Sequence, residues 1–165
     1  MREIRRRILL TVLVVLAAGC TPNRPAPADM VAAADALDKE FTTAFNKGDV
    51  AAVMATFWNS PDFFSIGLDG MGVQGWAAAK DAMVQTLAGM KGATIVFVDP
   101  RNIPLGDVVL GVGKIRISIP ADSGRSEEMV VRYTDIKALR DGKWVVVHDH
   151  ASAPMPPTPT VPASK

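Results

Sequence analysis

Cysteine is nearly absent from this chain of 165 residues, because Cys20 is the only one. A single cysteine excludes an intrachain disulfide. Histidine is almost as scarce, since His148 and His150 are the only two. A metal ion bound by both would need a third ligand, which a carboxylate such as Asp62 would have to supply. We therefore expect neither a metal site nor a cofactor.

Several catalytic motifs are also missing. The chain has no phosphate-binding loop of the Walker type and no Gly-x-Ser-x-Gly nucleophile elbow. Gly111 and Gly113 lie inside a predicted strand, without the strand–turn–helix setting of a dinucleotide site. These absences count against nucleotide-dependent enzymes and hydrolases with a serine nucleophile.

No apolar run is long enough to span a membrane as a mature helix. Residues 8–16 form a short apolar segment after four arginines, and small residues at 17–19 precede Cys20. This pattern resembles a bacterial lipoprotein signal, which implies cleavage before Cys20, lipidation of Cys20 and anchoring in the cell envelope. An ordinary secretory signal is the alternative. Because Thr21 replaces the aspartate associated with inner-membrane retention, the resemblance implies an outer-membrane address facing the periplasm in a diderm host.

Charge of either sign is not in excess. The chain has 18 Lys+Arg against 17 Asp+Glu, and removal of residues 1–19 leaves 14 against 16. A weakly acidic chain without a basic cluster is not expected to bind nucleic acid.

Composition divides the chain into four parts. Residues 1–19 are the predicted signal peptide and residues 20–28 a proline-rich tether. Residues 29–153 form the predicted domain, and residues 154–165 a disordered proline-rich tail. Hydrophobic residues make up 48% of the chain, which excludes disorder for its middle.

Periodicity of apolar residues predicts the secondary structure. Helical spacing predicts three helices, which begin after Asp29, Asp49 and Gly75. Alternation predicts strands at 62–66, 94–98, 107–119 and 127–139, and a last strand after the Asp141-Gly142 turn. Gly111 and Gly113 inside a strand predict a bulge or a sharp bend. The predicted class is α+β, with three N-terminal helices packed on a strongly curved antiparallel sheet.

The order of these elements resembles a known superfamily. The most specific segments are Phe45-Asn46-Lys47-Gly48-Asp49 and residues 144–152. Together they resemble the SnoaL-like branch of the nuclear transport factor 2-like superfamily, which is similar in fold to ketosteroid isomerases and polyketide cyclases. The resemblance covers residues 29–153 and implies a cone-shaped fold with a pocket at its open end. The superfamily includes enzymes and non-catalytic binding modules, so the fold does not decide the function.

The last strand carries the first candidate site residues. Alternation places Trp144, Val146, His148, His150 and Ser152 on one face. Imidazole titrates near neutral pH, so either histidine is a candidate general base or a donor that orients a ligand. The alternative is that both are pocket-wall residues held by hydrogen bonds.

The neighbouring strand supplies Arg132 and Thr134, which the resemblance places toward the pocket. An inward Arg132 needs an anionic ligand or a carboxylate partner, and Asp62 is the candidate. Tyr133, the only tyrosine, lies on the opposite face. A ketosteroid isomerase mechanism needs a donor such as tyrosine in the pocket, so this placement counts against that chemistry.

These residues predict a small-molecule site. Trp58 and Trp76 are further candidates for the pocket wall, where they would suit a flat apolar ligand, although a core role is the alternative. We expect the cone to bind a small apolar or weakly acidic molecule. An isomerase, cyclase or dehydratase with His148 or His150 as general base is the second hypothesis. A structural or interaction domain is the third.

The sequence also predicts a homodimer. Residues 94–98 and 145–147 are apolar on both strand faces, whereas helices cover only one face of the sheet. The outer face is therefore expected to be buried against a second copy.

Overall fold

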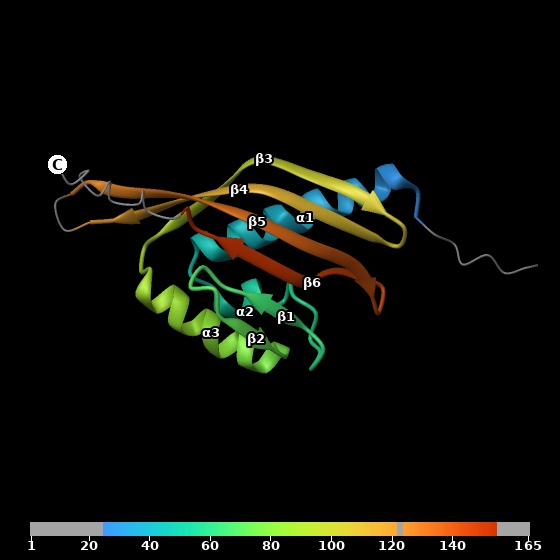
Figure 1. Cartoon of the computed structure of the whole chain (residues 1–165), viewed down its shortest axis with the longest axis horizontal. Helices are drawn as coiled ribbons and strands as arrows, with labels where there is room; N and C mark the ends of the chain where they lie inside the picture. Colours follow the sequence, from blue (N-terminus) through green and yellow to red (C-terminus); the bar gives the residue numbers. More distant parts are fainter. Residues whose placement is uncertain (1–24, 122–123, 155–165) are drawn as a thin grey trace, which may run out of the picture.

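The computed structural model describes residues 25–121 and 124–154, which form three helices and six strands (Figure 1). The helices are α1 (Pro27–Asn46), α2 (Val50–Met54) and α3 (Trp76–Gly89). The strands are β1 (Phe64–Ile66), β2 (Gly72–Gln74), β3 (Thr94–Leu105), β4 (Val108–Pro120), β5 (Ser126–Arg140) and β6 (Lys143–Ser152).

All six strands form one curved sheet in the order β2-β1-β6-β5-β4-β3. The long strands β3 to β6 pair antiparallel, as predicted. However, β1 pairs with β6 in the parallel direction, so the sheet is mixed and not purely antiparallel. The two short strands β1 and β2 also precede α3, which separates it from the other two helices. The α+β class and the curvature are confirmed.

The helix boundaries follow their capping residues. Asp49 accepts a hydrogen bond from the Ala52 amide at 2.9 Å and begins α2, as predicted. Gly75, with φ of 86°, precedes α3, also as predicted. Helix α1 begins at Pro27, before the expected cap Asp29, because proline is well suited to the first helical position.

The glycines of β4 make room for side chains of β5. A Cβ at Gly113 would lie 3.0 Å from the Tyr133 ring and 3.2 Å from the Asp99 carbonyl oxygen. The β4–β5 pairing itself is regular, and the bulge lies in β3, between Val98 and Arg101. The predicted irregularity is therefore in the strand next to the glycines.

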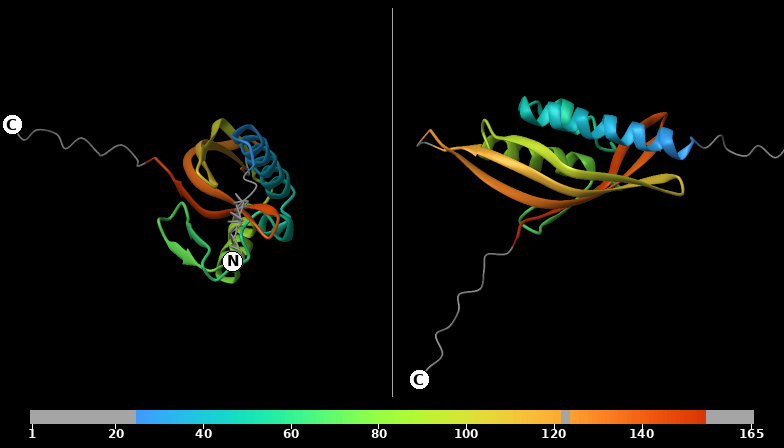
Figure 2. Two further views of the ribbon diagram at one scale, coloured as in Figure 1. Left: turned by 90° about the vertical axis from the view of Figure 1, so that its right-hand side faces the viewer. Right: turned by 90° about the horizontal axis from the view of Figure 1, so that it is seen from above.

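The long strands of the curved sheet wrap around α1, and α3 lies with the β1–β2 hairpin below these long strands in Figure 1 (Figure 2). The core fills the space between the helices and the inner face of the sheet. Its larger buried side chains are Leu37, Phe45, Val53, Met54, Phe57, Phe63, Ile95, Ile117, Val131 and Val146. In the part of the chain that is described, no helix is long and apolar enough to cross a membrane.

Candidate functional site

A bulge in β6 decides which side chains face the interior. Ile136 of β5 pairs with His148, but the next residue, Lys137, pairs with Val146. Val147 is therefore an extra residue, and the alternation of side chains reverses across it. Val146 is buried in the core on the inner face, and beyond the bulge Asp149 takes the inner position.

The two histidines consequently lie on the outer face, contrary to the expectation. His148, His150 and Ser152 still share one face, but they pair with Ile136, Thr134 and Arg132. The His148 Nδ1 atom lies 2.8 Å from the carbonyl oxygen of Phe64, and its ring stacks on the Phe64 ring. This histidine thus attaches β1 to β6.

Arg132 and Thr134 are exposed on this outer face. The reason is that β5 buries the alternate residues, from Val131 to Lys137, against the helices. Asp62 is also exposed, and no ion pair in residues 25–121 and 124–154 joins it to Arg132. The predicted site residues of β5 and β6 therefore lie side by side, but on the outer face of the sheet and not inside the cone.

Trp58 and Trp76 line a separate groove of about 420 Å³, together with Arg140 and Lys143. The Trp76 Nε1 atom donates a hydrogen bond to the Met54 carbonyl oxygen at 2.9 Å. The Arg140 guanidinium lies 5.3 Å from the centre of the Trp58 ring. Both tryptophans are half-buried, and Trp76 also packs against the hydrophobic core, in agreement with the alternative of a core role.

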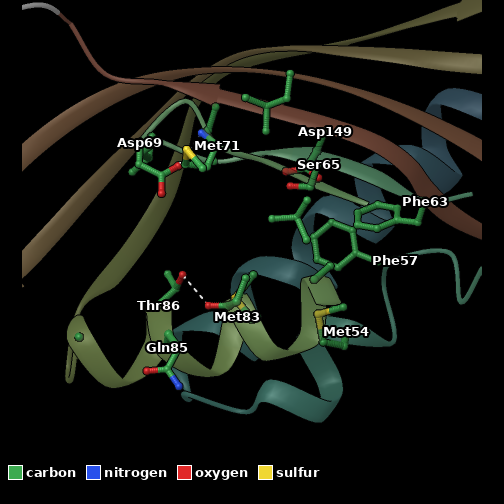
Figure 3. A pocket seen from close by; sticks show the side chains of 18 of the residues that line it. Met54, Phe57, Phe63, Ser65, Asp69, Met71, Met83, Gln85, Thr86 and Asp149 are labelled. Atoms are coloured by element: carbon green, nitrogen blue, oxygen red, sulfur yellow. Dashed lines mark hydrogen bonds between the residues drawn. The ribbon is translucent and has the colours of Figure 1, made fainter. Parts of the chain in front are cut away.

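Two cavities lie inside the cone, on either side of Asp149. The larger, of about 540 Å³, is bounded by α3, the β1–β2 hairpin and the end of β6 (Figure 3). The smaller, of about 120 Å³, lies between α1 and the inner face of β5 and β6. Phe57, Asp149 and Ala151 line both cavities.

Asp149 faces two polar side chains across the sheet. Ser65 of β1 and Asp135 of β5 are its direct pairing partners. Burial raises the pKa of the Asp149 carboxyl to about 6, against a lowering by the Ser65 hydrogen bond. The charge of Asp135 raises this pKa further, and that of His148 lowers it. The Oδ1 atom is buried and has no hydrogen-bond partner in the described chain.

Tyr133 supplies a second unpartnered oxygen on the inner face. Its hydroxyl is buried and has no hydrogen-bond partner among residues 25–121 and 124–154. Burial raises the pKa of this phenol, with further contributions from the nearby carboxylates of Asp38 and Asp135. The Tyr133 ring packs edge-to-face on Phe97 at 4.9 Å. The hydroxyl therefore stays protonated and can donate a hydrogen bond near neutral pH.

A buried ion cluster lies beside these two residues. The Lys137 Nζ atom is fully buried and contacts Asp38 at 2.9 Å and Asp135 at 2.8 Å. It also donates to Asn102 Oδ1 at 3.0 Å, and Asn102 donates in turn to Asp38. Burial raises the pKa of Asp135, against the lowering effect of Lys137. The cluster therefore contains one basic group, Lys137, and two acidic groups, Asp38 and Asp135.

The sequence does not predict that Asp149 and Tyr133 lie on the inner wall of the cone. Asp149 stands between the two histidines, and strict alternation assigned it to the outside because the Val147 bulge has no sequence signal. The sequence predicts the strand of Tyr133 correctly, but it predicts that the side chain points away from the pocket, on the face opposite Arg132. The available signal was Lys137, since a charged residue between apolar neighbours of β5 indicates a buried ion pair. In the described part of the chain no three His, Cys, Asp or Glu side chains are arranged to hold a metal ion.

A model of the SnoaL-like domain family matches residues 35–156. The chain belongs to the SnoaL-like family. This assignment agrees with the cone and its inner cavities, and it confirms the superfamily that segments 45–49 and 144–152 indicated. A comparison with curated proteins gave no significant match.

Solved structures share the fold of this SnoaL-like domain. An uncharacterised protein with a cystatin-like fold from Caulobacter vibrioides is 22% identical, with a TM-score of 0.66 over 78% of this chain and 92% of that one. A putative dehydratase of the NTF2-like family from Streptomyces avermitilis is 16% identical, with a TM-score of 0.69 over 79% and 100%. An NTF2-like superfamily protein from Salmonella enterica serovar Typhimurium is 18% identical, with a TM-score of 0.70 over 85% and 99%. These identities support the fold alone.

Proposed function

We propose that this SnoaL-like domain binds a small, largely apolar molecule inside the cone, with Asp149 and Tyr133 as its polar contacts. One observation carries the proposal: Asp149 Oδ1 and Tyr133 Oη are buried side-chain oxygens on one inner wall, and neither has a hydrogen-bond partner among residues 25–121 and 124–154. Buried polar groups in folded proteins are nearly always hydrogen-bonded. A ligand that reaches both would satisfy them.

The shape and lining of the larger cavity support a small organic ligand. Its volume of about 540 Å³ is within the usual range of about 300–1,000 Å³ for such sites. Its lining is mostly apolar and includes Met54, Phe57, Phe63, Val73, Met83 and Met90. Trp58 and Trp76 do not fill the cone, which counts against the structural-domain hypothesis.

An acid–base enzyme is the second candidate, and Asp149 is the residue that favours it. A carboxyl with a pKa of about 6 accepts and releases protons near neutral pH. Tyr133 could polarise a carbonyl on the same wall, as the chemistry of isomerases and dehydratases requires. In this version Asp149 takes the role that the sequence hypothesis gave to His148 or His150.

Binding can be tested by NMR with a set of small ketones, enones and alcohols on the full-length protein. The informative variants are Asp149→Asn and Tyr133→Phe, which remove one polar contact each. Each substitution should weaken the binding of a ligand by about 1–3 kcal/mol. Ser152→Ala, on the outer face, is the matched control and should leave affinity unchanged. Equal binding by all four proteins would contradict the proposed site.

We further propose lipid anchoring at Cys20 in the bacterial envelope, on the outer membrane if the host is diderm. The support is the signal-like pattern before Cys20, which lies outside the described residues.

Homodimerisation through the outer sheet face is also proposed. Val96 of β3 and Val130 of β5 are exposed at 54% and 41%, which a second copy would cover. Sedimentation velocity at tens of micromolar distinguishes the monomer from the dimer.

A further inference from the structure

The smaller cavity has a strongly acidic lining. Asp38, Asp135 and Asp149 all line it, and no lysine or arginine of the described part of the chain does. His150 and its pairing partner Thr134 also border this cavity, although the register of β5 and β6 puts both side chains on the outer face. The ligand part that enters here therefore meets three carboxyl groups, of which Asp38 and Asp135 are paired with Lys137 from outside the lining and Asp149 is not.

Aromatic rings surround the same cavity. Phe41, Phe57, Phe97 and Tyr133 line it. They form a continuous edge-to-face chain, with ring centres 5.9 Å apart for Phe41–Phe57, 6.3 Å for Phe41–Phe97 and 4.9 Å for Phe97–Tyr133. The face of an aromatic ring carries negative potential and attracts organic cations.

We propose that the smaller cavity binds the ammonium head group of an organic cation, whose apolar arm occupies the larger cavity. The inference deepens the proposed function by naming the ligand class of the same site. It narrows the expectation of an apolar or weakly acidic ligand, because an anion in this cavity would face Asp149 and two carboxyl groups that already share the single ammonium of Lys137.

The dimensions fit a head group and a tail. A volume of about 120 Å³ is slightly below that of a cavity that holds one benzene ring, about 150 Å³. It therefore accepts a group such as trimethylammonium, but not a whole drug-sized molecule. The adjoining cavity of about 540 Å³ shares Phe57, Asp149 and Ala151 with it and has flexible methionines in its wall.

The charge balance also favours a cation. Lys137 is paired with two carboxyl groups, Asp38 and Asp135, so the cluster contains one more acidic group than basic groups. Asp149 adds a second when it ionises, and Ser65 is its only neutral polar neighbour on β1. Among the α3 residues that line the larger cavity, Gln85 and Thr86 carry the polar side chains, and both are neutral. Asp69 of the β1–β2 turn adds another acid. His148, on the outer face of the sheet, is an opposing charge that lowers the pKa of Asp149.

The test compares choline with 3,3-dimethylbutan-1-ol, its neutral isostere, by NMR titration of the full-length protein. Choline should bind at least tenfold more tightly, with shifts at Asp149 and Tyr133. Hexyltrimethylammonium should bind more tightly than choline because its chain reaches the larger cavity, and hexanoate should not bind. Affinity for choline should fall as the pH drops through about 6, since Asp149 then takes up a proton.

Two variants separate the charge from the rings. Asp149→Asn should remove the preference for choline over its isostere while keeping the cavity shape. Phe97→Leu should lower the affinity for choline severalfold and lower the affinity for the isostere less. Asp81→Asn, on the exposed side of α3, is the control and should change neither.

Equal affinity for choline and the isostere would overturn the ammonium inference and leave the proposed small-molecule site intact. No binding of any cation, with neutral ketones still bound, would do the same. An unchanged preference in folded Asp149→Asn would also overturn it.

Discussion

Asp149 is less stable as an anion inside the cone than in water, because burial removes its hydration. Its folded pKa of about 6 exceeds the ordinary value of 3.8, so the folded protein holds this proton more tightly than the unfolded chain does. Protonation of Asp149 therefore stabilises the folded protein, and this stabilisation is complete below about pH 4. It is lost as the pH rises through about 6.

The expected consequence is that Asp149→Asn stabilises the protein at pH 7.5. The gain is up to roughly 3 kcal/mol, because a neutral amide avoids the burial of a charge. Urea unfolding at pH 4.5 and pH 7.5 measures it, and the gain should be much smaller at the lower pH. Asp62→Asn, at an exposed carboxylate, is the control with little expected change. A less stable Asp149→Asn protein at pH 7.5 would show that favourable contacts of the carboxylate, such as the Ser65 hydrogen bond, outweigh the cost of its burial.

Gly111 is the residue that permits the Lys137 cluster. A Cβ at this position would lie 2.7 Å from Lys137 Nζ and would overlap the Asp135 carboxylate. Gly111→Ala should therefore destabilise the protein by at least about 2 kcal/mol. Gly89→Ala is the matched control, because its Cβ would meet no atom within 4 Å. Thermal unfolding of both proteins compares them, and equal melting temperatures would exclude the tight fit.

At the scale of elements, the short strand β1 depends on β6 for its place in the sheet. His148 Nδ1 bonds the Phe64 carbonyl oxygen, whereas His150 has no equivalent contact with β1. We predict that His148→Ala costs about 1 kcal/mol of stability and that His150→Ala changes it by less than about 0.5 kcal/mol. Denaturant unfolding gives both values. Neither variant should alter ligand affinity by more than about twofold, and a large loss of binding would return the histidines to the site.

The elements themselves were predictable, but the faces of two strands were not. Residues 94–98, 107–119 and 127–139 alternate or run apolar in ways that identify β3, β4 and β5. The face assignment of β6 depended on unbroken alternation from Trp144 to Ser152, and one extra residue at Val147 reverses it. The assignment of Arg132 rested on the resemblance. Burial of Lys137 with Asp38 places the other face of β5 inward, and Asp38 is 99 residues away in sequence.

Short strands were the other difficulty. β2 has three residues, and its residues Gly72 and Gln74 are exposed, so no periodic pattern marks it. The parallel pairing of β1 with β6 joins segments about 80 residues apart, which local patterns do not encode.

At the scale of the whole molecule, the domain begins close to the predicted anchor. Helix α1 starts at Pro27, seven residues after Cys20. Cys20→Ser should release the protein from the membrane fraction, because lipidation requires the thiol and stable anchoring requires more than one acyl chain. Fractionation of cells and mass spectrometry of the N-terminal peptide test this. An unmodified wild-type N-terminus, or equal membrane retention of Cys20→Ser, would contradict it.

The bulge at Val147 has a consequence for how this chain is compared with its relatives. A homologue with a deletion at this one position would keep the β5–β6 pairing on both sides of the gap, so its carboxylate would still face the interior. A homologue of the same length that pairs residue 147 regularly with β5 would instead turn the imidazoles at positions 148 and 150 toward the ligand and the carboxylate between them toward solvent. Two lineages with the same residues in β6 would therefore carry different pocket chemistry if only one of them has the bulge. Function can be transferred between such proteins only after the register of β6 has been compared.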